Sequence, residues 1–102
     1  MVTATRTHVT FQTSCPDARE VYLVGDFNDW SMTDTPMQPV GNGMWCIRRS
    51  LPPGRHRFRY YAVQDYRYHF DAPWGKRLWL TDPTVETVIN RVGGRDSVVE
   101  VA

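Results

Sequence analysis

Apolar and polar side chains alternate along most of this chain, and clusters of glycine, proline, asparagine and aspartate separate the alternating runs. A period of two places successive side chains on opposite faces of an extended strand. The pattern predicts strands at 6–13, 19–27, 37–40, 44–51, 55–64 and 96–101. Short strands at this spacing are typical of an all-β, immunoglobulin-like β-sandwich, and a β-barrel is the alternative.

The run 55–64 shows what the two faces of such a strand would carry. Its core face is predicted to hold His56, Phe58, Tyr60 and Ala62. Its other face would hold Arg55, Arg57, Arg59, Tyr61 and Val63. One interpretation is a solvated face whose charges discourage edge pairing. The other is a binding face, where a guanidinium donates hydrogen bonds to a polar ligand beside an aromatic ring.

Length and charge limit the class of protein. A chain of 102 residues is expected to form one domain, residues 1–102, and 41% hydrophobic residues suit a globular core. No apolar run approaches the ~18 residues of a membrane span. The first residues lack an apolar signal core, which favours a cytoplasmic location. The net charge of +1 argues against nonspecific binding of nucleic acid, although residues 48–77 carry a net +6.

Nothing in the sequence predicts catalysis, a metal site or a cofactor. Cys15 and Cys46 are expected to be reduced thiols, Cys15 in a turn and Cys46 as a small apolar residue in a strand. The three histidines lack metal-ligand spacing, and no glycine-rich phosphate loop is present. We therefore expect a protein that binds rather than an enzyme.

Trp30 is the most informative single residue. It follows a strong apolar strand but lies in the polar stretch NDWSMTDTP at 28–36, where full burial is unfavourable. It would either cover an edge of the core or present a flat apolar surface. Such a surface suits the C–H face of a pyranose ring, while neighbouring groups such as Asn28 would satisfy the sugar hydroxyls.

A longer series of motifs surrounds this tryptophan. The chain contains VYLVGDFNDWS at 21–31, then Met37, Trp45, LPPG at 51–54, HRFRYYAV at 56–63 and DSVVEV at 96–101. This series resembles the glycogen-binding domains of the early-set immunoglobulin-like superfamily, including carbohydrate-binding module family 48. Such domains occur in the β subunit of AMP-activated protein kinase and at the N-terminus of isoamylases and glycogen-branching enzymes. The similarity to stand-alone bacterial isoamylase early-set domains is particularly close, over about residues 6–64 and 90–101.

The resemblance implies a non-catalytic module that binds α-1,4-glucans such as glycogen, starch or maltooligosaccharides through stacking on surface aromatic rings. It places the first ring at Trp30 and the basic residue at Arg59. A second ring falls on Tyr66 by an ungapped count, or on Tyr68 when the later aspartate is used as the anchor. The polar residue before the last strand falls on Asp96, where glycogen-binding members carry asparagine.

Residues 72–91 do not align with the family pattern and contain Trp74 and Trp79, each a further candidate ring. Within 82–93 we expect a loop with a short strand or one helical turn. Exposed aromatic and arginine residues also suit a protein interface, with a glycogen-metabolising enzyme or a second copy of the chain as the partner. The RHRFRYY run would fit single-stranded nucleic acid, but the near-zero net charge argues against it.

Overall fold

The computed structural model describes residues 2–4, 8–64 and 76–102. Nine strands and one short 3-10 turn, η1 (Asp26–Asn28), make up its regular structure. The strands are β1 (Val2–Ala4), β2 (Val9–Ser14), β3 (Ala18–Gly25), β4 (Gln38–Gly41), β5 (Met44–Arg49), β6 (Gly54–Gln64), β7 (Lys76–Leu80), β8 (Thr87–Ile89) and β9 (Arg95–Val101). Within these ranges, no helix has the length and apolar character needed to cross a lipid bilayer.

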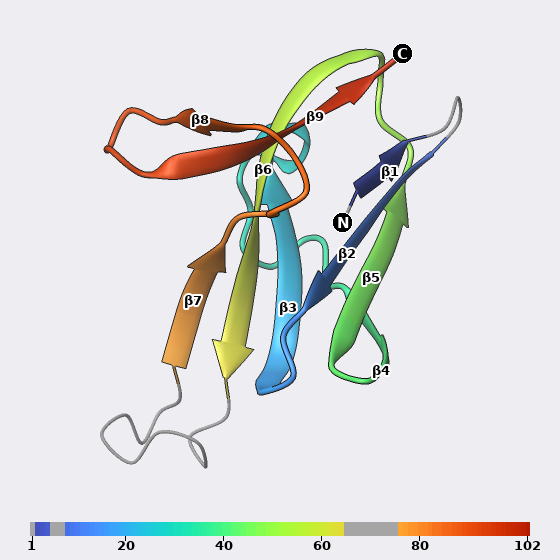
Figure 1. The fold of residues 1–102 in the computed structure, drawn as a ribbon, viewed down its shortest axis with the longest axis vertical. Helices are drawn as coiled ribbons and strands as arrows, with labels where there is room; N and C mark the ends of the chain where they lie inside the picture. Colours follow the sequence, from blue (N-terminus) through green and yellow to red (C-terminus); the bar gives the residue numbers. More distant parts are fainter. Residues whose placement is uncertain (1, 5–7, 65–75) are drawn as a thin grey trace.

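The strands form two antiparallel sheets that pack face to face (Figure 1). The first sheet has the order β1-β2-β5-β4, and the second has the order β3-β6-β9-β8, with β7 also paired to β6. This two-layer arrangement is the β-sandwich that the alternating pattern predicted. The barrel alternative is wrong because the two sheets remain separate.

The long strand β6 organises the second sheet. One edge pairs with β3 along much of its length, whereas the other edge is divided between two partners. Residues Gly54–Phe58 pair with β9, and Tyr60–Gln64 pair with β7 (Figure 1). Side chains from β3, β7 and β9 are therefore brought beside those of a single strand.

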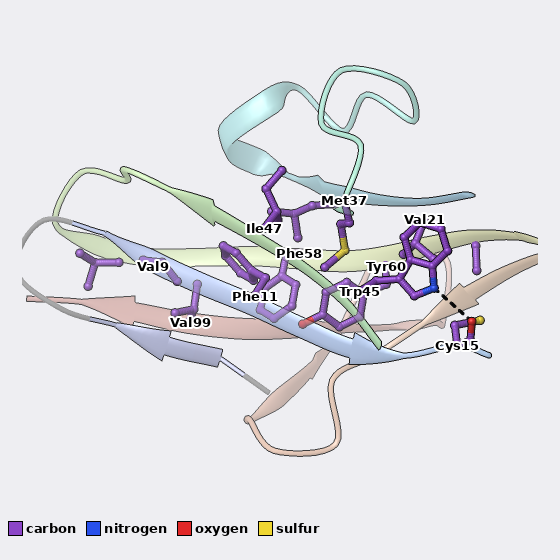
Figure 2. Close-up of a cluster of buried hydrophobic side chains, with 13 residues drawn as sticks. Val9, Phe11, Cys15, Val21, Met37, Trp45, Ile47, Phe58, Tyr60 and Val99 are labelled. Carbon is purple, nitrogen blue, oxygen red and sulfur yellow. Dashed lines mark hydrogen bonds between the residues drawn. The ribbon is translucent and has the colours of Figure 1, made fainter. Parts of the chain in front are cut away.

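The core lies between the sheets and is rich in aromatic side chains (Figure 2). Phe11 of one sheet meets Phe58 of the other edge to face, with ring centroids 4.9 Å apart. The indole N–H of Trp45 donates a hydrogen bond to the carbonyl oxygen of Cys15 at 3.1 Å. Such edge-to-face contacts add to the stabilisation that comes from burying the rings.

The core face predicted for the run 55–64 is confirmed. Phe58, Tyr60 and Ala62 are fully buried, while His56 is half-buried. Tyr60 carries its hydroxyl into the core and donates a 2.7 Å hydrogen bond to the buried carboxylate of Asp82. The backbone N–H of Asp82 in turn donates to the hydroxyl of Ser97, also at 2.7 Å. The buried polar groups of Tyr60, Asp82 and Ser97 are thus hydrogen-bonded.

Two expectations need correction. The strand predicted at 19–27 ends at Gly25, because the amide of Asn28 folds back onto the strand end and the chain turns at η1. Cys15 begins the turn expected there, with its carbonyl accepting from the Ala18 N–H at 3.1 Å, and its side chain is only 6% exposed and belongs to the core. The sequence analysis also did not predict β1 and β7, which have only three and five residues of alternating pattern.

The segment 82–93 forms the short strand β8, so the strand alternative is confirmed and the helical turn is wrong. Its paired partner β9 follows a tight turn at 90–94. Both cysteines are free thiols. Cys46 lies between buried Trp45 and Ile47 but points to the opposite, partly exposed face of its sheet.

Candidate functional site

The loop between β3 and β4 is fixed at its base by the side chain of Asn28. The Oδ1 atom of Asn28 accepts a hydrogen bond from the backbone N–H of Gly25 at 3.0 Å. Its amide nitrogen donates to the carbonyl of Leu23 and to the hydroxyl of Thr35, both at 3.0 Å. Asn28 therefore joins the segment leaving β3 to the segment that returns along it.

This fixed loop presents Trp30 at the surface. Trp30 has a backbone φ of +57°, as does Asp29 before it, and its N–H donates to the carbonyl of Gly25 at 2.8 Å. The left-handed conformation is uncommon for a bulky residue and costs of the order of 1 kcal/mol. Strained positions of this kind cluster at functional sites. The indole is 40% exposed and thus does not serve as a core side chain.

The outer face of the second sheet provides the next elements. Pairing of β3 with β6 sets Val24 opposite Arg59, and pairing of β6 with β7 sets Tyr61 opposite Trp79. Successive side chains alternate across a strand, so the side chains of Arg59 and Tyr61 lie on the same face. Val24 is fully buried on this outer face, beneath the longer side chains around it.

Trp79 and Arg59 form a stacked pair. The guanidinium carbon of Arg59 lies 5.1 Å from the centroid of the Trp79 ring, a cation–π geometry. The Tyr61 ring supports the indole from another side, at 4.7 Å between centroids. Trp79 nevertheless remains 42% exposed. Its orientation is therefore fixed by neighbours while part of the ring stays open to solvent.

Asp96 and Asn90 bound the site on the side of β8 and β9. A carboxylate oxygen of Asp96, a nearly buried residue, lies 3.8 Å from the Nε of Arg59 and accepts a 3.2 Å hydrogen bond from the amide of Asn90. The other amide atom of Asn90, Oδ1, accepts hydrogen bonds from the backbone N–H groups of Val92 and Gly94. Asn90 thus fixes the β8–β9 turn and links that turn to Asp96.

These groups surround one surface cavity of about 340 Å³. That volume lies within the range of ordinary small-ligand sites, about 300–1,000 Å³. The cavity combines exposed indole rings with charged and amide groups. It is lined by Val24, Trp30, Arg57, Arg59, Trp79, Asn90, Arg91, Val92 and Asp96.

The cavity brings together four of the residues that the sequence analysis selected: Trp30, Arg59, Trp79 and Asp96. Asn28 does not line it and instead holds the loop that carries Trp30. The remaining candidates, Tyr66, Tyr68 and Trp74, lie outside the described residues.

Asn90 and Arg91 were missed because the segment up to residue 91 could not be aligned with the family pattern. The Gly93-Gly94 pair was a usable signal, since a turn there returns the preceding residues toward Asp96. Arg57 was recognised as part of the arginine face but was not selected as a site residue.

A second hollow of about 350 Å³ differs in character. Its lining side chains include Gln12 and Thr13 of β2, with Leu80 and Pro83 near the end of β7. It contains neither an aromatic ring nor a charged side chain. The cavity at Trp30 is therefore the better candidate for a specific polar ligand.

The fold and the candidate site together define an immunoglobulin-like β-sandwich with a cavity lined by aromatic and cationic side chains on one outer sheet face. Residues 2–84 match carbohydrate-binding module 48, the isoamylase N-terminal domain, and the chain belongs to this family. This confirms the resemblance drawn from the sequence motifs.

Curated relatives agree with the family assignment. The chain is 38% identical over 92 residues to a 1,4-α-glucan branching enzyme of Lactobacillus acidophilus, which covers 90% of this chain. It is 44% identical over 86 residues to the 1,4-α-glucan-branching enzyme of Dictyostelium discoideum, covering 76% of this chain. In each case the matched region is 13% of the relative's length. The chain therefore spans only a small part of these enzymes.

Proposed function

We propose that this domain is a non-catalytic module that binds α-1,4-glucan in the cavity between Trp30 and Trp79. Two partly exposed indoles and the Arg59 guanidinium line one cavity, and this arrangement is the main support for the proposal. The family, and the glucan named for the branching-enzyme relatives, support this choice of ligand.

Each indole offers a flat apolar surface of the kind that covers the C–H face of a glucose ring. Trp30 and Trp79 come from different elements, so successive glucosyl units of one chain would contact separate rings. Trp79 is supported by Arg59 and Tyr61, so little ordering of its side chain is needed on binding. Binding to so open a face is expected to be weak, with micromolar to millimolar Kd per site.

Sugar hydroxyls need hydrogen-bond partners once they leave water. The Nε–H of Arg59 is buried and has no hydrogen-bond partner among the described residues, while the Arg59 side chain as a whole is 24% exposed. Its terminal N–H groups are donors for hydroxyl oxygens. Asp96 accepts from Asn90 and retains acceptor capacity for a hydroxyl proton.

The number of carboxylates in the cavity lining favours glucan binding over glucan hydrolysis. Hydrolysis of glycosidic bonds ordinarily uses two carboxyl groups on either side of the bond. Of the described residues that line the cavity, Asp96 alone carries a carboxylate, and it is already held by Asn90 and Arg59. This arrangement favours a ligand that is bound and released unchanged.

The proposal is tested with Trp30→Ala and Trp79→Ala. Calorimetric titration with maltoheptaose should show about 30-fold weaker binding for each variant, because loss of a central aromatic contact costs about 2 kcal/mol. Retardation in glycogen-containing native gels should fall in parallel. Met32→Ala is the matched control, since Met32 lies in the same loop, is 47% exposed and does not line the cavity.

Thermal unfolding should show all three variants folded at the titration temperature, which separates loss of binding from loss of the fold; Trp79→Ala should unfold at a somewhat lower temperature, because it also loses the contacts with Tyr61 and Arg59. Parent-like affinity in Trp30→Ala would refute the role of this cavity. Absence of maltoheptaose binding in the parent, with a mass that rises with concentration, would instead favour the protein-interaction alternative.

A further inference from the structure

The cavity has an excess of positive charge that a neutral glucan does not require. Three arginines line it, at positions 57, 59 and 91, against the single carboxylate of Asp96. Arg59 is close to that carboxylate, at 3.8 Å from Nε to oxygen. Two guanidinium charges therefore remain without an acidic counterpart in the lining.

Arg55, on the same strand as Arg57, provides a comparison, because its guanidinium forms ion pairs within the sheet. Arg55 donates to Glu100 at 2.8 Å and to Glu86 at 2.9 Å, so its charge is balanced by two carboxylates. In contrast, neither Arg57 nor Arg91 has a carboxylate partner for its guanidinium within the part of the chain that the structure describes. Both of these side chains are exposed.

The fold holds these two arginines in defined places. Arg57 lies on the outer face of β6, two residues before Arg59, and its backbone N–H donates to the carboxylate of Asp26 at 3.0 Å. Arg91 lies in the β8–β9 turn that Asn90 fixes through its side chain. The two guanidinium groups thus reach one cavity from different elements.

We propose that Arg57 and Arg91 form an anion subsite, so that the module prefers α-glucan bearing phosphate monoesters to neutral α-glucan. This proposal rests on the glucan-binding function above. Guanidinium groups donate to phosphate oxygens in paired hydrogen bonds and keep their charge at all physiological pH values. The indoles would hold the glucose rings while the arginines bind a phosphate attached to one of them.

Binding of phosphate by two exposed arginines predicts that the preference for phosphorylated over neutral glucan depends on the salt concentration. A phosphate monoester carries close to two negative charges at neutral pH, and each exposed guanidinium–phosphate pair adds a modest stabilisation. We expect phosphorylated maltoheptaose to bind about 2- to 30-fold more tightly than maltoheptaose at 20 mM salt. At 500 mM salt the preference should shrink, because exposed charges are screened.

The test is calorimetric titration of the domain with four ligands: maltoheptaose, maltoheptaose carrying one phosphate monoester, glucose 1-phosphate and inorganic phosphate. Arg57→Gln and Arg91→Gln should each reduce the preference for the phosphorylated chain by a few fold. Because both residues line the cavity, some affinity for neutral maltoheptaose can be lost as well, but the loss for the phosphorylated chain should be larger by those few fold. Arg48→Gln is the matched control, because Arg48 is exposed on β5 of the opposite sheet.

The outcomes separate this proposal from the one on which it rests. Equal affinity for neutral and phosphorylated maltoheptaose would overturn the anion subsite and leave glucan binding intact. Inorganic phosphate or glucose 1-phosphate binding as tightly as the phosphorylated chain would also overturn it, because the site would then recognise the anion alone. Failure of both oligosaccharides to bind would overturn the glucan-binding function itself.

Discussion

Gly25 shows how a single residue fixes the geometry of the site. Its φ is −162°, which any residue can adopt, so the need for glycine is one of space. A Cβ at this position would lie 2.7 Å from the carbonyl oxygen of Arg57 and 2.5 Å from the ring of Phe27. The end of β3 therefore approaches β6 more closely than an alanine allows, just before the loop that carries Trp30.

Gly25→Ala is expected to destabilise the domain by about 1–3 kcal/mol, because backbone and an aromatic ring must move to admit the methyl group. Chemical denaturation monitored by circular dichroism measures this change. Gly41→Ala is a contrasting variant: a Cβ there meets no atom within 4 Å, and its cost comes from a φ of +93°. Unchanged stability of Gly25→Ala would show that the strand end can relax.

At the residue scale, the sequence selected Trp30, Arg59 and Asp96, and the structure places all three in the lining of one cavity, while their part in glucan binding stays a prediction. A tryptophan in a polar loop and an arginine in an alternating strand have few alternative environments, and the family motif gave their positions. The sequence did not allow us to predict that the Asn28 side chain forms its hydrogen bonds inside the loop rather than facing the cavity. Nothing in NDWS distinguishes an amide that faces a ligand from one that folds back onto Leu23 and Thr35.

The loop from Asp26 to Pro36 is the element whose rigidity matters most for the proposed function. Its two ends are held by Asn28 and by the backbone hydrogen bond from Leu23 N–H to the carbonyl of Thr35, at 2.9 Å. Trp30 lies between them at the surface. The loop should therefore hold the indole in place before any ligand arrives, which lowers the entropy cost of binding.

Asn28→Ala should weaken maltoheptaose binding although Asn28 does not line the cavity. It removes three hydrogen bonds and is expected to cost about 1–3 kcal/mol of stability. Calorimetry at a temperature where the variant remains folded measures the affinity. Asn28→Asp keeps the acceptor for Gly25 and loses both donors, so it should fall between parent and alanine variant. Parent-like affinity in Asn28→Ala would contradict this positioning role.

Strands of six or more residues were predictable at this scale, because several alternations establish a period. Of the shorter strands, β4 was expected at 37–40 and β8 was one alternative within 82–93, but β1 and β7 were not predicted. In β7, the pattern Lys76 to Leu80 gives only two inward leucines, and its place beside β6 depends on register with a distant segment. The β8–β9 turn brings Asn90 next to Asp96 through a local hairpin, whose register the sequence pattern did not specify.

Across the whole molecule, a polar network with three buried members and one exposed one joins β6, β9 and the segment after β7. Tyr60, Asp82, Ser97 and Thr84 are its members. Burial raises the pKa of the Asp82 carboxyl, but hydrogen bonds, including those from Thr84 and Tyr60, outweigh burial and hold the pKa below its usual 3.8. Burial and the Asp82 hydrogen bond raise the pKa of Tyr60 above its usual 10.0.

The signs of these shifts predict how stability depends on pH. The lowered pKa of Asp82 adds stability that is present above about pH 4 and is lost as the pH falls below it. The raised pKa of Tyr60 adds stability that is present below pH 10 and is lost as the pH rises beyond it. The free energy of unfolding, measured in urea from pH 2 to 11, should therefore decline at both ends.

Asp82→Asn should flatten the acidic limb of that profile, since an amide does not ionise. Asp34→Asn, a change of the same type in the exposed loop, is the control and should leave the limb unchanged. An acidic limb that persists in Asp82→Asn would mean that other carboxyl groups dominate acid unfolding.

The cavity lined by Trp30 and the hydrophobic core lie on opposite faces of one strand, β3. Val24 forms part of the cavity floor, and the adjacent Leu23 points into the core between the sheets; both are 0% exposed. Only the backbone of β3 separates the two regions. Any substitution that tilts this strand to fill or empty space beneath it will also alter the shape of the cavity, so core packing and the proposed binding of glucan must evolve together.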